Sequence, residues 1–252
     1  MGVITERVGA AGDYEEVEIP GMPDTAGSPG GTVLRRQAPR PSRRAVLHAH
    51  SSGESGVPED LARWYTERGF HFYITDLTAP GAPRWRARLR RRAALRARFA
   101  RLDAACRHLR ESDGIDSVVI SAHAADALTV ALWCDARRDA EPAGAVILSS
   151  PAFGRRVRRG LRIACPVLVM CPAADGTAGG PDTPSAPRGP GRLRRRSRRA
   201  PTALGPHVTW LWLPGGLDSP EQAGGADRRL LFDEMGRWLG TYMYGQVRDQ
   251  LL

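Results

Sequence analysis

Hydrophobic and polar residues follow two different periods along this chain. Short apolar runs rich in β-branched residues predict buried strands, and apolar residues that recur every three or four positions predict helices. Strands that alternate with helices in this way are typical of the α/β class, a mostly parallel sheet with helices on both faces. The expected strands are 14–20, 32–37, 45–50, 70–77, 117–121, 145–149, 167–171 and 207–213, and the expected helices are 58–68, 95–109, 127–137 and a long one from about 227.

The first two strands are expected to pair as a hairpin. Residues 14–20 and 32–37 alternate in polarity as edge strands do, and the segment between them is rich in turn residues. The helix over 95–109 carries its apolar residues on one face, which indicates that this face packs on the sheet. These residues are Leu95, Phe99, Leu102, Cys106 and Leu109.

The chain of 252 residues is long enough to bury one large core, and its hydrophobic content of 42% is ordinary for a globular protein. We therefore expect a single domain over 1–252, with a partly disordered loop over 172–206, where Gly, Pro and Arg dominate. No apolar run approaches the roughly 20 residues that span a bilayer, and the N-terminal segment lacks a signal-peptide pattern. These observations predict a cytoplasmic protein without a membrane partner.

All 37 basic residues are arginine, and the formal net charge is +10. Eleven of the arginines lie in 84–110 and seven in 188–199. Such clusters attract phosphate and carboxylate groups, so one hypothesis is an interaction module for an acidic protein partner. The alternative is a solvated helix face and a loose loop. Nucleic acid is disfavoured as the partner, because the sequence shows neither an aromatic-rich sheet face nor a recognition-helix motif.

The four cysteines are Cys106, Cys134, Cys165 and Cys171. They show no Cys-x-x-Cys spacing and no nearby histidine pattern, so we expect buried thiols and neither a metal site nor a disulfide framework. No cofactor is expected. An alternative for Cys171 is a replacement nucleophile, because it ends a predicted strand.

Residues 117–127 carry the pattern that bears most directly on function. The apolar run 117–121 is followed by Ala122-His123-Ala124-Ala125-Asp126 and then by a predicted helix. This arrangement is similar to the Gly-His-Ser-x-Gly-Gly nucleophile elbow of the α/β-hydrolase superfamily. The resemblance places Ala122, Ala124 and Asp126 on the first glycine, the serine and the next glycine.

The resemblance extends from about Arg43 to Gly240 and is closest to monoglyceride-lipase-like and serine-aminopeptidase-like members. Residues 45–50 resemble the third strand of that fold, and 61–77 resemble its first helix and fourth strand. Ser150–Gly154 reaches the next strand within about a dozen residues, where many relatives insert a lid. The resemblance therefore implies an α/β-hydrolase fold with no cap domain and an open site.

The same resemblance implies a degenerate catalytic triad. Ala124 has no oxygen to deprotonate, and Asp218 stands where the family carries its catalytic histidine. Asp175 matches the acidic member of the triad. Because the elbow glycines are replaced, Cβ atoms at Ala122 and Asp126 predict a relaxed or shifted turn.

Three functions remain open at this point. The first is a non-hydrolytic accessory protein, or pseudoenzyme, that binds a small molecule or peptide at the carboxyl edge of the sheet. Its candidate binding residues are His50, Ser51, Ser52, His123 and Ala124. The second is a repurposed epimerase, cyclase or lyase that uses acid-base or substrate-assisted chemistry, and the third is the interaction module described above.

The repurposed catalyst would use Asp126, Asp175 and Asp218, because carboxylates that converge above the sheet can act as acid and base. The simpler interpretation is that Asp126 complements a helix N-terminus and that Asp218 lies on an exposed turn. Ordinary hydrolysis would need a different alignment, with Ser121, Ser51 or Ser52 as the nucleophile.

Two histidines near the elbow are given structural roles. We expect His123 to be a hydrogen-bonded structural residue and not a base. His48 is expected to face the opposite side of its strand from His50.

Overall fold

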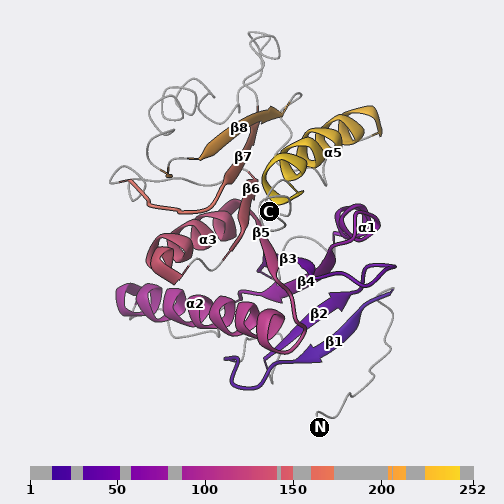
Figure 1. Cartoon of the computed structure of the whole chain (residues 1–252). Helices are drawn as coiled ribbons and strands as arrows, with labels where there is room; N and C mark the ends of the chain where they lie inside the picture. Colours follow the sequence, from indigo (N-terminus) through magenta and orange to yellow (C-terminus); the bar gives the residue numbers. More distant parts are fainter. Residues whose placement is uncertain are drawn as a thin grey trace, which may run out of the picture.

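Eight strands pair into one sheet in the order β1-β2-β4-β3-β5-β6-β7-β8 (Figure 1). The computed structural model describes residues 13–23, 31–51, 58–78, 87–140, 143–149, 160–172, 204–205, 207–213 and 225–244. The strands are β1 (Glu15–Glu18), β2 (Thr32–Arg36), β3 (Arg44–His50), β4 (His71–Asp76), β5 (Ser117–His123), β6 (Ala145–Ser149), β7 (Val167–Pro172) and β8 (Val208–Leu213).

The predicted hairpin and the predicted parallel sheet are both confirmed. Strands β1 and β2 pair antiparallel, and β2 joins the rest of the sheet through an antiparallel pairing with β4. All the remaining neighbours, from β4 and β3 through to β7 and β8, are parallel. The carboxyl ends of the parallel strands therefore meet at one edge of the sheet, which is where parallel sheets bind ligands.

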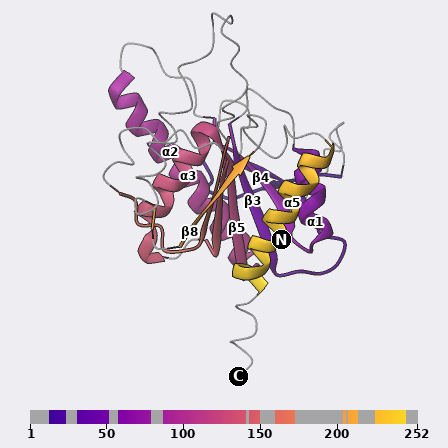
Figure 2. The ribbon, with the colours of Figure 1, turned by 90° about the horizontal axis from the view of Figure 1, so that it is seen from above.

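Helices cover the sheet on both sides, as Figures 1 and 2 show. Helices α2 and α3 lie on one face, and α1 and α5 lie on the other. The helices are α1 (Glu59–Glu67), α2 (Ala87–Glu111), α3 (Ala124–Ala136) and α5 (Gly225–Leu239), with a 3-10 turn η2 (Arg138–Ala140) and a π turn η7 (Gly240–Tyr244). This is the layered α/β architecture that the sequence predicts.

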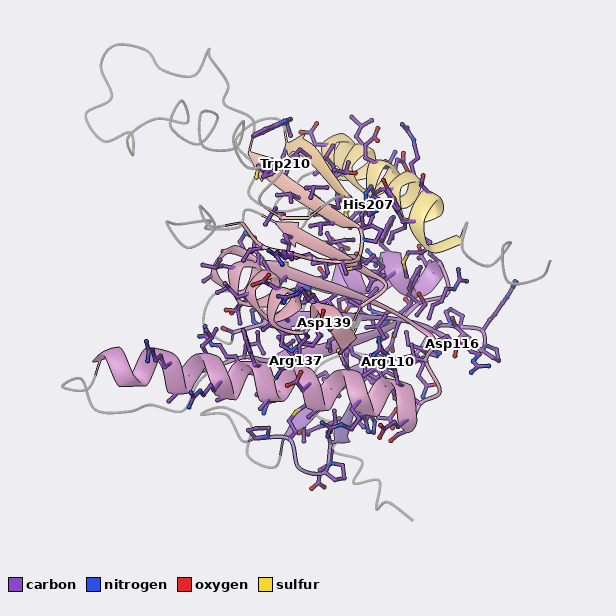
Figure 3. All side chains as sticks on the ribbon, turned by 60° about the vertical axis from the view of Figure 1, so that its left-hand side comes forward. Arg110, Asp116, Arg137, Asp139, His207 and Trp210 are labelled. Atoms are coloured by element: carbon purple, nitrogen blue, oxygen red, sulfur yellow. The ribbon has the colours of Figure 1, made fainter. Side chains whose placement is uncertain are left out.

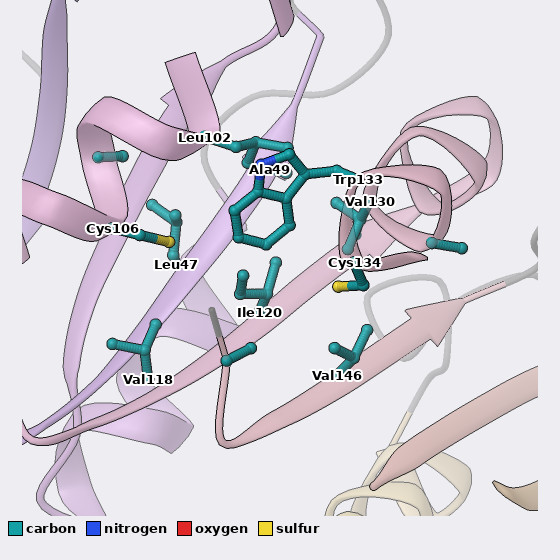
Figure 4. Close-up of a cluster of buried hydrophobic side chains, with 14 of the residues drawn as sticks. Leu47, Ala49, Leu102, Cys106, Val118, Ile120, Val130, Trp133, Cys134 and Val146 are labelled. Atoms are coloured by element: carbon teal, nitrogen blue, oxygen red, sulfur yellow. The ribbon is translucent and has the colours of Figure 1, made fainter. Parts of the chain in front are cut away.

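Two hydrophobic cores fill the spaces between the sheet and its helical layers. Val118 and Ile120 of β5 belong to the core under α2 and α3, together with the fully buried Trp133 (Figure 4). Val119 of the same strand belongs to the core under α1 and α5. Because both faces of each central strand are buried, these strands are continuously hydrophobic in the sequence.

The junction between β5 and α3 differs from the prediction. Strand β5 continues two residues beyond Ser121 to His123, and α3 begins at Ala124 instead of Ala127. No loop separates the two elements. The alanines between Ser121 and Ala127 suit the end of a buried strand and the start of a helix equally, so the sequence did not define the boundary.

Two further predictions concern the membrane and the long loop. The part of the chain that the structure describes contains no helix long and apolar enough to cross a membrane. The loop predicted over 172–206 lies almost entirely outside the described residues. Its partial disorder and the single-domain assignment therefore remain predictions.

Candidate functional site

Ala124 joins β5 to α3 in a strained backbone conformation. Its φ of 48° makes it the one non-glycine residue with positive φ among those that the structure describes. A left-handed conformation costs an ordinary residue roughly 1–2 kcal/mol. A sharp, strained turn from strand to helix is the geometry of a nucleophile elbow.

The prediction of a relaxed or shifted turn is therefore wrong. The Cβ atom of Ala122 is accommodated in the core under α2 and α3, where the residue is only 1% exposed. Asp126 lies inside the first turn of α3. Neither side chain prevents the turn, and the strain falls on Ala124 alone.

Asp126 and Ser51 connect the two segments that border the elbow. The Ser51 hydroxyl donates a 2.8 Å hydrogen bond to Oδ1 of Asp126. Ser51 directly follows β3, and Asp126 is buried with 9% exposure. A carboxylate in the first turn of a helix is also favoured by the helix dipole. Both the simple structural role and a chemical role of Asp126 fit this position.

His48 and Ser121 form a polar pair behind the elbow. Nδ1 of His48 lies 3.3 Å from Oγ of Ser121, and both residues are 5% exposed. The backbone of Ser121 is paired with β3 on one side and β6 on the other. A nucleophile needs an accessible oxygen and backbone amides that can bind an oxyanion. Ser121 is held inside the sheet, so this pair is better explained as part of the core.

His48 and His50 lie on the same face of β3, which corrects the expectation that they face opposite sides. Their rings stack with centroids 6.3 Å apart. Residues two apart on a strand share a face, because side chains alternate with a period of two. His50 ends β3 at the carboxyl edge and pairs in register with Asp76 of β4.

The side chain of His123 is half-buried. Its Nε2 atom is buried and has no hydrogen-bond partner among the residues that the structure describes, so the expected hydrogen bond is not found at that nitrogen. His123 borders a narrow gap behind the elbow that it shares with His48, Leu61, Ser121, Ala122, Ser149, Met170 and Met235. This placement supports a structural role for His123 over that of a surface base.

The structure gathers only part of the predicted site. Ala124, Ser51, Asp126 and His50 lie at the carboxyl edge of the sheet. Ser52, Asp175 and Asp218 lie outside the described residues. The convergence of three aspartates therefore remains a prediction.

Asp76 is a further carboxylate at this edge that the sequence reasoning missed. It ends β4 beside β3, and its Oδ1 accepts a 2.7 Å hydrogen bond from the backbone N–H of Thr78. The sequence pattern could have identified Asp76 as a site residue, because it falls near the carboxyl end of a predicted parallel strand, where such sheets bind ligands.

Three of the four cysteines, Cys106, Cys134 and Cys171, are buried and do not provide a replacement nucleophile. Burial raises the pKa of Cys171 from 9.0 to about 11 and that of Cys106 to about 12, and it also raises the pKa of Cys134. These residues are thiols at neutral pH, whereas the thiolate is the nucleophile. No group of three or more His, Cys, Asp or Glu side chains within the described ranges could hold a metal ion.

Part of the first arginine cluster is structural. Arg101 is 2% exposed and donates to the carbonyl oxygens of Pro23 and Thr32. Arg98 donates a 2.9 Å hydrogen bond from Nε to the carbonyl oxygen of Leu77. These two guanidinium groups attach α2 to the hairpin and to the end of β4, so the cluster is more than a solvated helix face.

The fold, the strand order and the turn at Ala124 together define the α/β-hydrolase fold. Solved structures of hydrolases share this fold over nearly the whole chain. Dienelactone hydrolase from Anabaena variabilis superimposes with a TM-score of 0.62 at 13% identity, covering 91% of this chain and 99% of that one. The esterase Pf2001 from Pyrococcus furiosus gives a TM-score of 0.61 at 11% identity, with coverages of 91% and 90%.

A third similar structure is the esterase Est1E from Butyrivibrio proteoclasticus, with a TM-score of 0.57, 12% identity and coverages of 92% and 99%. No protein-family model matches the chain, and no curated protein matches it in sequence. At these identities the likeness establishes the fold alone.

Proposed function

We propose that this protein binds a small molecule or peptide at the carboxyl edge of its sheet and does not act as a serine hydrolase. The observation that carries the proposal is Ala124, which occupies the strained elbow position with a methyl group. In triad hydrolases, loss of the nucleophile or of the histidine lowers turnover by about 10⁶-fold, leaving roughly 10³–10⁴-fold over water.

The strained backbone of Ala124 supports a binding role for this edge of the sheet. A residue held in the left-handed region costs of order 1–3 kcal/mol and persists only where the surrounding structure imposes it. Here the uninterrupted passage from β5 into α3 imposes it. The site therefore keeps its shape although Ala124 brings no reactive atom.

Asp126 supports a non-hydrolytic role for the site. Hydrolases of this fold stabilise the oxyanion with the backbone N–H that follows the nucleophile and with a second one from the segment after the third strand. In this protein Ser51, at the end of β3, holds the carboxylate of Asp126 near those two segments. A negative charge there opposes an oxyanion and favours a ligand that presents a cation or a hydrogen-bond donor.

Non-hydrolytic acid-base catalysis is the second candidate function. It is favoured by the position of the Asp126 carboxylate, which is buried beside the elbow and oriented by the hydrogen bond that it accepts from Ser51. This candidate requires a second carboxylate from Asp175 or Asp218.

Ester hydrolysis and ligand screening together test the proposal. We expect the purified protein to hydrolyse p-nitrophenyl butyrate no faster than buffer, and an active esterase serves as the positive control. A thermal-shift screen of small amines and short peptides should find ligands that stabilise the protein. Those ligands should fail to stabilise Ala125→Trp, which obstructs the exposed first turn of α3 beside the elbow. Hydrolysis above background would contradict the proposal, and so would a screen in which every stabilising ligand stabilises Ala125→Trp as much as the parent protein.

A further inference from the structure

A cavity lies at the opposite edge of the sheet from Ala124. Its volume is about 570 Å³, and it is lined by Arg138, Asp139, Leu161, Arg162, Ile163, Ala164 and Gly205. These residues follow the end of α3 or precede the starts of β7 and β8, so they gather at the amino edge of the parallel strands. The cavity is therefore separate from the site at the elbow.

Close backbone packing holds the walls of this cavity in place. The N–H of Ile163 donates a 3.2 Å hydrogen bond to the carbonyl oxygen of Leu204. Gly205 has a φ of 128°, and a Cβ atom there would lie 2.3 Å from the carbonyl oxygen of Ile163. Only glycine permits this approach. Leu161 and Ile163, which are 5% and 1% exposed, give the cavity an apolar floor.

Two arginines, Arg162 and Arg138, place positive charge at the mouth of the cavity. The carboxylate of Asp135 is engaged with the backbone, where it accepts a 2.8 Å hydrogen bond from the N–H of Arg162. The guanidinium of Arg162 makes no ion pair with any residue that the structure describes.

The second arginine, Arg138, is only loosely neutralised. Its Nε lies 3.6 Å from Oδ1 of Asp139, whose side chain is 92% exposed. Figure 3 shows Asp139 beyond the end of α3, near Arg137. Arg137 forms a 2.7 Å ion pair with Asp103 of α2. Arg162 and Arg138 are thus the cationic groups left to meet a ligand.

We propose that this cavity binds an amphipathic carboxylate, whose apolar body lies on Leu161 and Ile163 and whose acid group pairs with Arg162 and Arg138. A volume of about 570 Å³ lies within the range of roughly 300–1,000 Å³ usual for small-molecule sites. The planar guanidinium donates two parallel hydrogen bonds to a carboxylate, so arginine suits this ligand better than lysine does.

Calorimetric titration of the full-length protein with octanoate tests the proposal. We expect saturable binding at one site, at least tenfold tighter than that of octanol, which has the same chain without the charge. Arg162→Glu should weaken octanoate binding at least tenfold. Ala164→Trp, which fills the cavity, should abolish it. The matched control is Arg107→Glu, which makes the same charge change on the exposed surface of α2 and should leave the affinity unchanged.

Three results would overturn the proposal: no saturable binding of octanoate, equal binding of octanol, or an equal loss of affinity in Arg162→Glu and Arg107→Glu. The last result would indicate attraction by the net charge of +10 and not by a site. Circular dichroism checks that each variant is folded. If Ala164→Trp does not fold, the two arginine variants still decide the outcome.

Discussion

The hydroxyl of Ser51 donates a 2.8 Å hydrogen bond to the carboxylate of Asp126, which joins the end of β3 to the first turn of α3. The two residues are 75 positions apart in the chain. Their contact fixes the relation between the two segments that supply oxyanion donors in hydrolases of this fold.

Removing this hydrogen bond should destabilise the protein. Ser51→Ala leaves a buried carboxylate with one donor fewer, so we expect the free energy of unfolding to fall by about 1–3 kcal/mol. Urea denaturation measures the change. The exposed Ser112 provides the control, and Ser112→Ala should change stability by less than about 0.5 kcal/mol. If Ser51→Ala lowers the free energy of unfolding no more than Ser112→Ala does, the hydrogen bond from Ser51 to Asp126 does not stabilise the fold.

Replacing Ala124 with glycine should stabilise the protein. Glycine adopts positive φ without the steric cost that alanine incurs, and the expected gain is up to about 1 kcal/mol after its greater unfolded-state entropy is subtracted. Ala125, the next residue, is helical and exposed, and Ala125→Gly should instead cost a few tenths to about 1 kcal/mol. Denaturation measures the change in the free energy of unfolding, and opposite signs of this change in the two variants verify the strain at Ala124. Changes of the same sign would exclude a left-handed Ala124.

A thiol introduced at the elbow can report the local charge. In Ala124→Cys, the carboxylate of Asp126 should make a cationic methanethiosulfonate reagent react several-fold faster than an anionic one. In the double variant Ala124→Cys/Asp126→Asn, the cationic and anionic reagents should react at similar rates. Peptide mapping by mass spectrometry separates the new thiol from Cys165, the most exposed of the native cysteines in the described structure. A faster anionic reagent, or no reaction with either, would contradict a cation-favouring and accessible site.

Stability should fall as the pH rises above about 9. The Cys106 thiol ionises near 9.0 when exposed, and burial raises its pKa to about 12 in the folded protein. Between these two values the unfolded state binds fewer protons than the folded state, so the free energy of unfolding decreases with pH. Denaturation at pH 8 and pH 10 should show a smaller loss in Cys106→Ala than in the parent protein. An identical loss in both would assign the effect to other groups.

The sequence predicted the elements of this fold better than their junctions. Continuous hydrophobic runs such as 145–149 identified β6 to the residue, because buried strands leave a clear pattern. The passage from β5 to α3 was misplaced, because its alanines suit a helix as well as a buried strand. The positive φ of Ala124 is imposed by the tertiary structure, and local sequence therefore does not encode it.

The site was predicted only in part, for a similar reason. Ala124 and Asp126 were found because they occupy motif positions next to a strand end. The hydrogen bond between Ser51 and Asp126 depends on strand order, which brings distant residues together. The cavity at Arg162 was not predicted, because its lining comes from short segments without a motif.

Labelling with a fluorophosphonate probe shows whether the protein carries a catalytic serine, because the probe reacts covalently with activated serines. We expect the folded protein to stay unlabelled under conditions in which an active esterase is fully labelled. Stoichiometric labelling of any serine, mapped by mass spectrometry and lost when that serine is replaced by alanine, would contradict this expectation.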